Sequence, residues 1–163
     1  MPRCIAVLVA VFALAAAGCS SPPKPLELEV PLGFGETWEH FADIADRSGF
    51  RVDPNGTDRG LRVFVSRWRE SPAPFGKGVR TRLHGAFEKV DERANRSGRE
   101  AWRLEFWVER QTVTDIARGF EPRESDWVDQ GQDREREQIL MGQLRLRYGQ
   151  ELAIEPAGRT RRP

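Results

Sequence analysis

The residues whose types and spacing most directly suggest a chemical event lie at the start of the chain. Arg3 precedes an uncharged apolar run, residues 5–17, and the small residues Ala17 and Gly18 lead directly into Cys19. The run has 13 residues, whereas a membrane-spanning helix needs about 20 apolar residues. A short positive segment followed by an apolar run and small residues is typical of a leader that a peptidase removes. The sequence therefore predicts cleavage near Cys19.

The segment from Leu14 to Ser21, LAAAGCSS, resembles the lipobox of bacterial lipoproteins. The resemblance covers only the leader, and it departs from the family pattern at Ala16, where leucine is more frequent. It implies that residues 1–18 form a lipoprotein signal peptide, that Cys19 is lipidated on sulfur, and that its new amine is acylated. In an envelope with two membranes, Ser20 implies an outer-membrane protein that faces the periplasm. An ordinary secretory signal, an uncleaved anchor and a buried helix remain alternatives.

Composition limits what the rest of the chain can do. Removal of residues 1–18 leaves 145 residues, the size of one domain. The two cysteines are Cys4 and Cys19, so the domain has neither a disulfide framework nor a thiolate nucleophile. The chain has 26 basic and 25 acidic side chains, and this balance argues against nucleic acid as a partner because phosphate binding needs a clustered basic excess.

Side chains that could support catalysis or bind a metal are few. The histidines are His40 and His84, and neither has a second histidine at metal-ligand spacing. We therefore expect no metal and no cofactor. Glu105 and Glu109 share one face of a predicted strand, but the strand rise places them roughly 13 Å apart, too far for paired acid–base work. A solvated face accounts for them, and we predict no catalytic residue.

Alternating residues predict a binding face on the sheet. If Leu83 and Leu104 point into the core, the opposite face carries aromatic rings together with cationic side chains. These are Phe64, Trp68, Arg80, Arg82, His84, Arg103 and Trp107. Aromatic and arginine side chains are enriched at binding hot spots, so we expect this face to bind an envelope protein or a glycolipid. The alternative is that residues 111–131, with Ile116, Phe120 and Trp127, fold back over it.

Periodicity predicts an α+β fold. Strands are expected at 26–30, 50–53, 61–66, 79–90 and 102–109, with Leu61, Val63 and Val65 facing inward, and helices at 36–48 and 133–148. Residues 111–131 carry no clear pattern. This order predicts a two-layer sandwich, with two helices packed on one face of a mainly antiparallel sheet of four to five strands. The predicted units are the signal peptide 1–18, the lipidated cysteine and proline-rich tether 19–26, a single domain 27–156 and a basic disordered tail 157–163.

Two functions remain open at this point, beside a purely structural role. The first is a membrane-anchored envelope lipoprotein that acts as a non-catalytic interaction or assembly module. The phrases SRWR at 66–69 and WRLE at 102–105 resemble those of small envelope lipoproteins of unassigned activity, and that resemblance implies no catalytic residues. The second is a small envelope hydrolase that acts on a wall or lipid substrate through carboxylates and His84.

Overall fold

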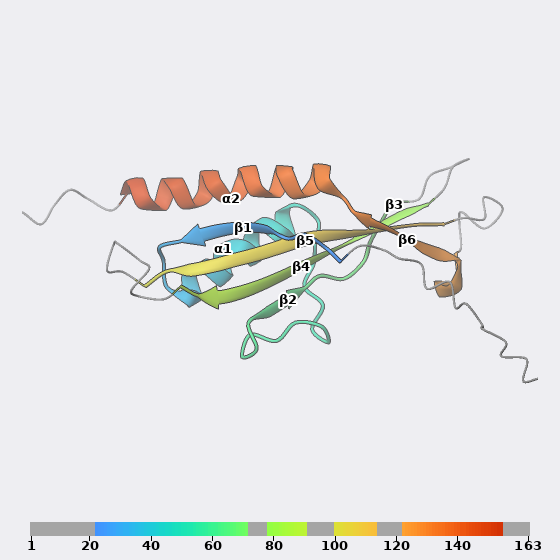
Figure 1. The fold of residues 1–163 in the computed structure, drawn as a ribbon, viewed down its shortest axis with the longest axis horizontal. Coiled ribbons are helices and arrows are strands. Elements are labelled where there is room, and N and C mark those ends of the chain that lie inside the picture. Colours follow the sequence, from blue (N-terminus) through green and yellow to red (C-terminus); the bar gives the residue numbers. More distant parts are fainter. Residues whose placement is uncertain (1–21, 72–77, 91–99, 114–121, 155–163) are drawn as a thin grey trace, which may run out of the picture.

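The computed structural model describes residues 22–71, 78–90, 100–113 and 122–154, with side chains as far as residue 149. The predicted signal peptide, Cys19, Ile116, Phe120 and the basic tail lie outside the described residues. The elements in chain order are β1 (Leu26–Val30), α1 (Phe34–Arg47), β2 (Val63–Val65), β3 (Arg69–Ser71), β4 (Val79–Lys89), β5 (Trp102–Val113), a 3-10 turn (Glu124–Asp126), β6 (Trp127–Gln132) and α2 (Arg134–Ile154). The chain has an α+β fold (Figure 1).

The strands form one antiparallel sheet of six members. β5 pairs with β4 along one edge and with β1 and β6 on the other, while β2 and β3 pair with β4. The expected count of four to five strands was therefore too low, because β3 and β6 were not predicted. The strand expected at 50–53 is absent from this part of the structure, where Val52 forms only an isolated bridge with Ser66.

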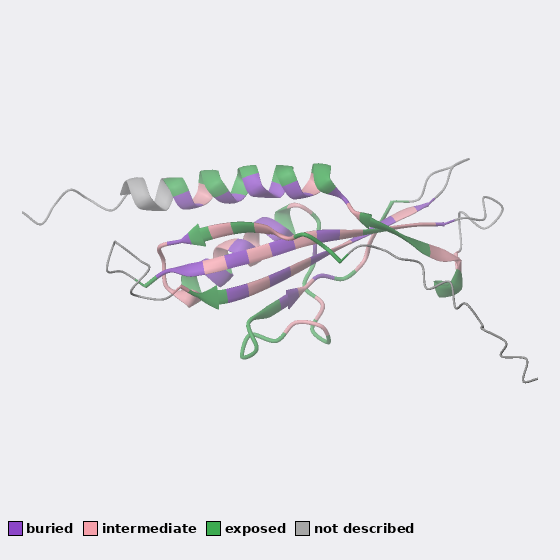
Figure 2. Cartoon of the chain, in the orientation of Figure 1, coloured by how far each residue is buried: buried purple, intermediate pink, exposed green. Residues whose placement is uncertain are grey.

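The long pair β4 and β5 is the frame of the sheet. Its register runs from Val79 opposite Thr112 to Lys89 opposite Trp102. Side chains alternate between the two faces of a strand, and the buried apolar ones between residues 83 and 108 fall on alternate residues as the sequence predicts. These are Leu83 and Phe87 on β4 and Leu104, Phe106 and Val108 on β5. Figure 2 shows the resulting alternation of burial along both strands.

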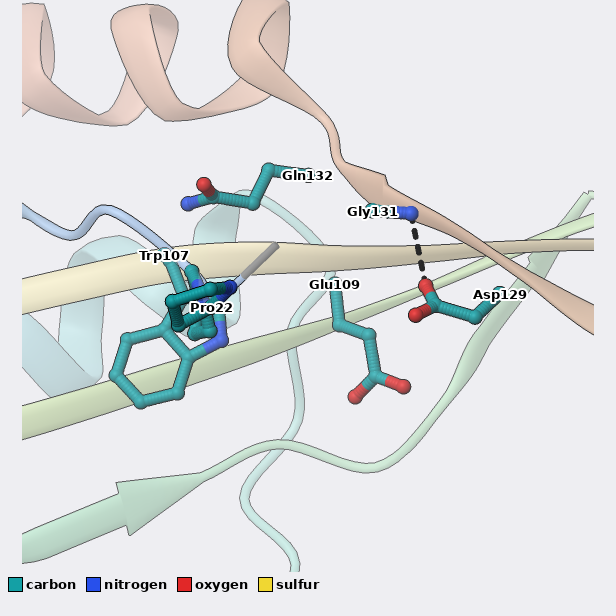
Figure 3. Close-up of a pocket in the computed structure, with 7 residues that line it drawn as sticks. Pro22, Trp107, Glu109, Asp129, Gly131 and Gln132 are labelled. Atoms are coloured by element: carbon teal, nitrogen blue, oxygen red, sulfur yellow. Dashed lines mark hydrogen bonds between the residues drawn. The ribbon is translucent and has the colours of Figure 1, made fainter. Parts of the chain in front are cut away.

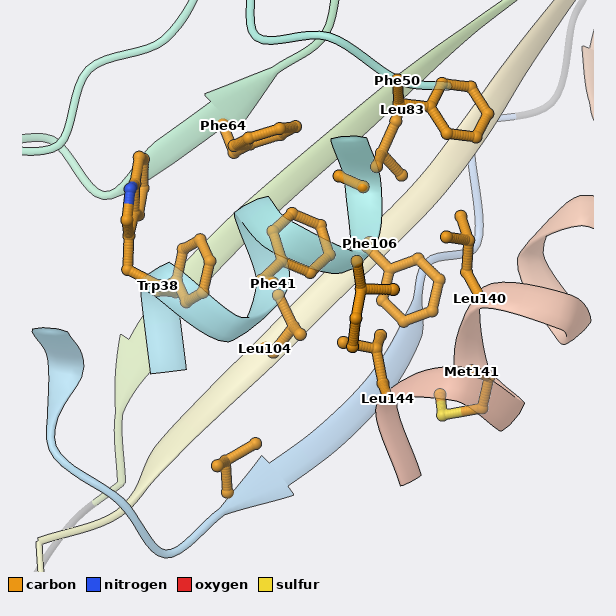
Figure 4. Packing of buried hydrophobic residues seen from close by; sticks show 14 of the residues in the cluster. Trp38, Phe41, Phe50, Phe64, Leu83, Leu104, Phe106, Leu140, Met141 and Leu144 are labelled. Atoms are coloured by element: carbon orange, nitrogen blue, oxygen red, sulfur yellow. The ribbon is translucent and has the colours of Figure 1, made fainter. Parts of the chain in front are cut away.

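Helix α1 packs its apolar side against this buried face. Measured between centroids, the ring of Phe41 lies 5.6 Å from that of Phe87. It lies 6.1 Å from that of Phe106 (Figure 4). The helix ends in a Schellman motif, in which Phe50 N donates to Ala45 O at 2.8 Å and Gly49 has φ +84°. Phe50 is buried as well, so the end of the helix is fixed by hydrogen bonds and by packing.

Phe64 belongs to this core and not to the opposite face, which corrects the sequence prediction. Its side chain is 0% exposed, whereas Leu61 is 75% exposed and Val63 is 38% exposed. β2 is only three residues long, and its pairing with β4 places Phe64 opposite Gly85. The pairing fixes which face each residue occupies, and a shift of one residue reverses the faces. The apolar pattern of so short a strand did not determine its orientation.

Helix α2 is attached to the sheet by a buried carboxylate. Glu137 is 0% exposed, and its Oε1 accepts the backbone N–H of Val108 at 3.0 Å. Asp133 N donates to Val108 O at 2.8 Å, and Asp133 Oδ1 accepts the N–H of Arg136 at 3.1 Å, which confirms the predicted N-cap. At the other end of the helix, Tyr148 Oη donates to Thr37 O of α1 at 3.0 Å. Polar contacts thus fix α2 at both ends of its packed surface.

Candidate functional site

Arg80 is the centre of a cluster on the face opposite the core, here called the aromatic clasp, which it forms with Trp68, Trp127 and Glu124. Its guanidinium carbon lies 4.3 Å from the ring centroid of Trp68 and 4.6 Å from that of Trp127. Its two terminal nitrogens donate to the carboxylate of Glu124, each at 2.8 Å, and its Nε donates to Gln111 at 2.8 Å. The side chain is only 5% exposed. Trp127 and Glu124 therefore fold back over Arg80, as the alternative interpretation of residues 111–131 expected for this part of the segment.

Arg82 is also engaged within the domain. Its Nη2 donates to Asp53 at 2.8 Å and its Nε donates to the carbonyl of Ser66 at 3.0 Å. The guanidinium also lies 5.4 Å from the ring centroid of Trp68. A phosphate that approached Arg80 or Arg82 would have to displace a carboxylate that is already hydrogen-bonded to it. The two arginines thus connect separate elements of the fold.

Arg103 is remote from this clasp. It lies between Glu29 of β1 and Glu88 of β4, with nitrogen–oxygen distances of 3.6 Å to each. Arg103 and Gln111 both belong to β5, and a separation of eight residues corresponds to roughly 27 Å along a strand. The predicted constellation is therefore divided between two ends of the sheet, with Phe64 on the other face.

His84 and Trp107 form a second group near the middle of the same face. Their rings stack with centroids 4.8 Å apart and planes 3° from parallel. His84 Nε2 lies 3.0 Å from Oε2 of Glu109, and Gln111 Nε2 donates to Oε1 of Glu109 at 2.9 Å. The hydrogen bond from His84 is the main reason that the pKa of Glu109 is lowered from its ordinary value, although partial burial opposes this change. Glu109 is therefore an ionised carboxylate held by two neighbours.

A pocket of about 200 Å³ opens beside Trp107 and Glu109. Its remaining walls come from the segment before β1 and from β6, and they comprise Pro22, Pro23, Asp129, Gly131 and Gln132. Figure 3 shows these side chains together with the hydrogen bond in which Gly131 N donates to Asp129 Oδ1 at 2.8 Å. The backbone of Gly131 has φ +80°, a conformation that glycine adopts without strain.

Sequence reasoning placed Trp107 correctly outside the core but did not identify this pocket. Glu109 was interpreted as part of a solvated face, Asp129 lies in the segment 111–131 for which no structure was predicted, and Gln132 directly follows that segment. The one available signal was Asp129-Gln130-Gly131, a combination typical of turns. Such a signal locates a turn but does not reveal which distant strand lies next to it.

The segment before β1 contributes to the pocket because hydrogen bonds hold it against the domain. Lys24 N donates to Gln132 Oε1 at 2.9 Å, and Gln132 Nε2 donates back to Lys24 O at 3.1 Å. Arg134 Nη1 also donates to Lys24 O at 2.9 Å. β1 begins at Leu26, the last residue of the predicted tether. The portion of that tether within the structure is hydrogen-bonded to the domain.

The remaining candidate features concern the second histidine, metal ligands and membrane-spanning helices. His40 Nε2 lies 3.3 Å from Arg147 Nη2, and the His40 ring lies 5.7 Å from that of Tyr148. Among the residues that the structure describes, no three His, Cys, Asp or Glu side chains come together as metal ligands would. No helix in the described ranges combines the length and apolarity needed to cross a bilayer.

Comparisons with known proteins do not add a family to this description: no family model matches the chain, and no match was found among curated proteins.

Proposed function

We propose that this chain is a lipid-anchored envelope lipoprotein, whose signal peptide 1–18 is removed and whose Cys19 carries the lipid. The proposal is supported by the lipobox-like sequence, and the double hydrogen bond between Lys24 and Gln132 bears on where an anchored domain would lie. Lys24 is five residues after Cys19, and five residues span at most about 18 Å when fully extended. The anchored domain would therefore remain close to the bilayer surface, with β6 and the start of α2 nearest to it.

We further propose a non-catalytic interaction or assembly role for the domain, on an outer membrane and facing the periplasm. The observation that carries this role is the half-buried Trp107 beside an open pocket, at the place where the segment before β1 is hydrogen-bonded to β6. A fixed aromatic ring next to charged side chains is a usual anchor for a partner. The partner would be an envelope protein or a glycolipid. Both helices would cover the other face as in a two-layer sandwich, which leaves the part of this face around Trp107 available.

Site-directed photo-crosslinking in cells tests this role. A photoreactive amino acid at Gln130, which is exposed on β6 near the pocket, is expected to capture a defined envelope component. The same amino acid at Glu135, which is exposed on the first turn of α2, is the control. Equal capture at both positions, or none at Gln130 in membrane-bound protein, would contradict the proposed role.

The hydrolase alternative is favoured by one specific observation, the 3.0 Å contact between His84 and Glu109. A carboxylate that orients an imidazole is a common arrangement for general-base catalysis. On this alternative, His84→Ala and Glu109→Gln would each abolish release of fragments from peptidoglycan or phospholipid, while His40→Ala would not. On the interaction role, neither variant changes hydrolysis because none occurs.

A further inference from the structure

We propose that the pocket beside Trp107 binds a small ligand that carries an ammonium group, either as a lipid headgroup or as a free amine. Of the seven described residues that line it, two are carboxylic acids, one is tryptophan and none is cationic. Carboxylates form charge-assisted hydrogen bonds with ammonium groups, and tryptophan is the aromatic residue that attracts cations most strongly. The lining therefore selects for positive charge.

The size of the pocket limits the ligand. Its volume is about 200 Å³, whereas pockets for drug-sized molecules are usually about 300–1,000 Å³. The space suits a single amine-bearing group better than a whole saccharide or peptide. An ethanolamine-type headgroup has this size and carries its charge at one end.

The two carboxylates are held in place before any ligand arrives. Glu109 is fixed by His84 at 3.0 Å and by Gln111 at 2.9 Å, and Asp129 is fixed by the N–H of Gly131 at 2.8 Å. Each carboxylate oxygen has two lone pairs, so these contacts leave capacity to accept from an ammonium group. Because the side chains are already ordered, binding would cost little conformational entropy.

The aromatic wall is fixed in the same way. The imidazole of His84 covers one face of the Trp107 indole with the planes 3° from parallel. This stacking holds the indole in one orientation, so a cation in the pocket would meet the opposite face or the ring edge. His84 thus orients both the indole of Trp107 and the carboxylate of Glu109.

Neighbouring cations must be considered because they could neutralise the site. Arg82 lowers the pKa of Glu109 through its charge, but its own hydrogen bonds go to Asp53 and to the carbonyl of Ser66. Arg134 lies at the start of α2 and donates to Glu137 at 2.8 Å and to the carbonyl of Lys24. Neither arginine lines the pocket. These two arginines therefore do not occupy the pocket.

This inference does not depend on lipidation of Cys19, because every residue that it uses lies within the described part of the chain. It can be tested on the full chain in a non-ionic detergent. The probes are tetramethylammonium and ethanolamine, with sodium chloride at equal ionic strength as the reference. The readout is the indole N–H resonance of Trp107, assigned by its loss in Trp107→Phe. We expect a saturable shift with both amines and none with sodium chloride.

Matched variants establish the site. Asp129→Asn keeps an oxygen that can accept from Gly131 N but removes the charge, and we expect about tenfold weaker binding, as for loss of one charge-assisted hydrogen bond. Glu135→Gln makes the same change on the exposed first turn of α2 and is expected to leave binding unchanged. No saturable shift with either amine, or equal weakening in both variants, would overturn the proposal.

Vesicles separate the two sources of the amine. If the natural ligand is a headgroup, vesicles that contain phosphatidylethanolamine shift the Trp107 resonance and vesicles of phosphatidylglycerol alone do not. If it is a free amine, ethanolamine shifts the resonance and neither vesicle does. If a lysine peptide binds while ethanolamine and vesicles do not, the pocket serves a protein partner and the proposal is wrong. Failure of lipid attachment at Cys19 would leave all of these results unchanged.

Discussion

The main chain of Lys24 exchanges two hydrogen bonds with the side-chain amide of Gln132, at 2.9 Å and 3.1 Å, although the two residues are 108 positions apart. Gln132 also donates to the buried carboxylate of Glu137 at 2.9 Å. The amide therefore links the segment before β1 to β6 and to the helix α2. This link places Pro22 and Pro23 at the pocket, and it connects the proposed anchor to the proposed binding site.

Removal of that amide is expected to release the segment before β1. Gln132→Ala loses both hydrogen bonds to Lys24, and each is worth about 0.5–1.5 kcal/mol. We expect faster hydrogen exchange at the amide of Lys24 and weaker binding of ethanolamine. Gln130→Ala, an exposed change on the same strand, should leave both unchanged. Unaltered exchange at Lys24 in Gln132→Ala would show that the link does not hold the segment.

Alanine at Gly85 is expected to destabilise the fold. A Cβ there would lie 2.8 Å from Cε1 of Phe41, and the Phe41 ring is buried against Phe64 and Phe87. Overpacking of this kind costs about 1–3 kcal/mol. Gly142→Ala is the control, because a Cβ there meets nothing within 4 Å and alanine stabilises a helix by up to about 1 kcal/mol relative to glycine. Urea denaturation should show changes of opposite sign, and equal changes would contradict the packing described for Phe41.

The two partners of the Arg80–Glu124 ion pair should differ in importance. The Arg80 side chain is 5% exposed and the Glu124 side chain is 83% exposed. Arg80→Lys keeps the charge but loses the planar fork that lies between Trp68 and Trp127, and we expect a loss of about 1.5–3 kcal/mol, typical of hydrogen bonds to charged groups. Glu124→Gln should change the free energy of unfolding by less than about 1 kcal/mol, because the exposed Glu124 carboxylate is screened by water and the amide oxygen of Gln can still accept from Arg80. A larger effect from Glu124 than from Arg80 would contradict the clasp.

The pKa of Glu109 should depend on His84. The folded-state pKa is lowered from 4.5, first by the hydrogen bond from His84, so ionised Glu109 stabilises the folded protein above that pH. This contribution is lost as the pH falls through the lowered pKa. His84→Ala should move the carboxyl pKa of Glu109 upward, as measured by carbon NMR, and weaken the dependence of stability on pH below 4.5. His40→Ala, on α1, should leave the titration of Glu109 unchanged.

The elements that alternation predicted well are long and half buried. β4 and β5 span 11 and 12 residues, and Leu83, Leu104 and Phe106 are buried as expected. Helix α1 was expected at 36–48 and lies at Phe34–Arg47, because Trp38, Phe41 and Ala45 repeat at helical spacing.

The elements that sequence reasoning missed are short or depend on distant partners. β3 and β6 span three and six residues, and their backbones are ordered by pairing with β4 and β5. The pocket was missed for the same reason, since it depends on contacts between segments far apart in the sequence. Trp107 and Glu109 come from one strand, but Asp129 and Pro22 reach them only through the hydrogen bonds of β6 and of Gln132. No local pattern in the sequence predicts that these four residues lie close together.

The most direct test of the lipoprotein assignment is mass spectrometry of the mature N-terminal peptide from protein made in a lipoprotein-processing host. We predict a peptide that starts at Cys19 and carries a diacylglyceryl group on sulfur with a fatty acyl group on its amine. We also predict that Cys19→Ala no longer fractionates with membranes. An unmodified cysteine, or a peptide that starts at another residue while the protein still fractionates with membranes, would contradict the assignment.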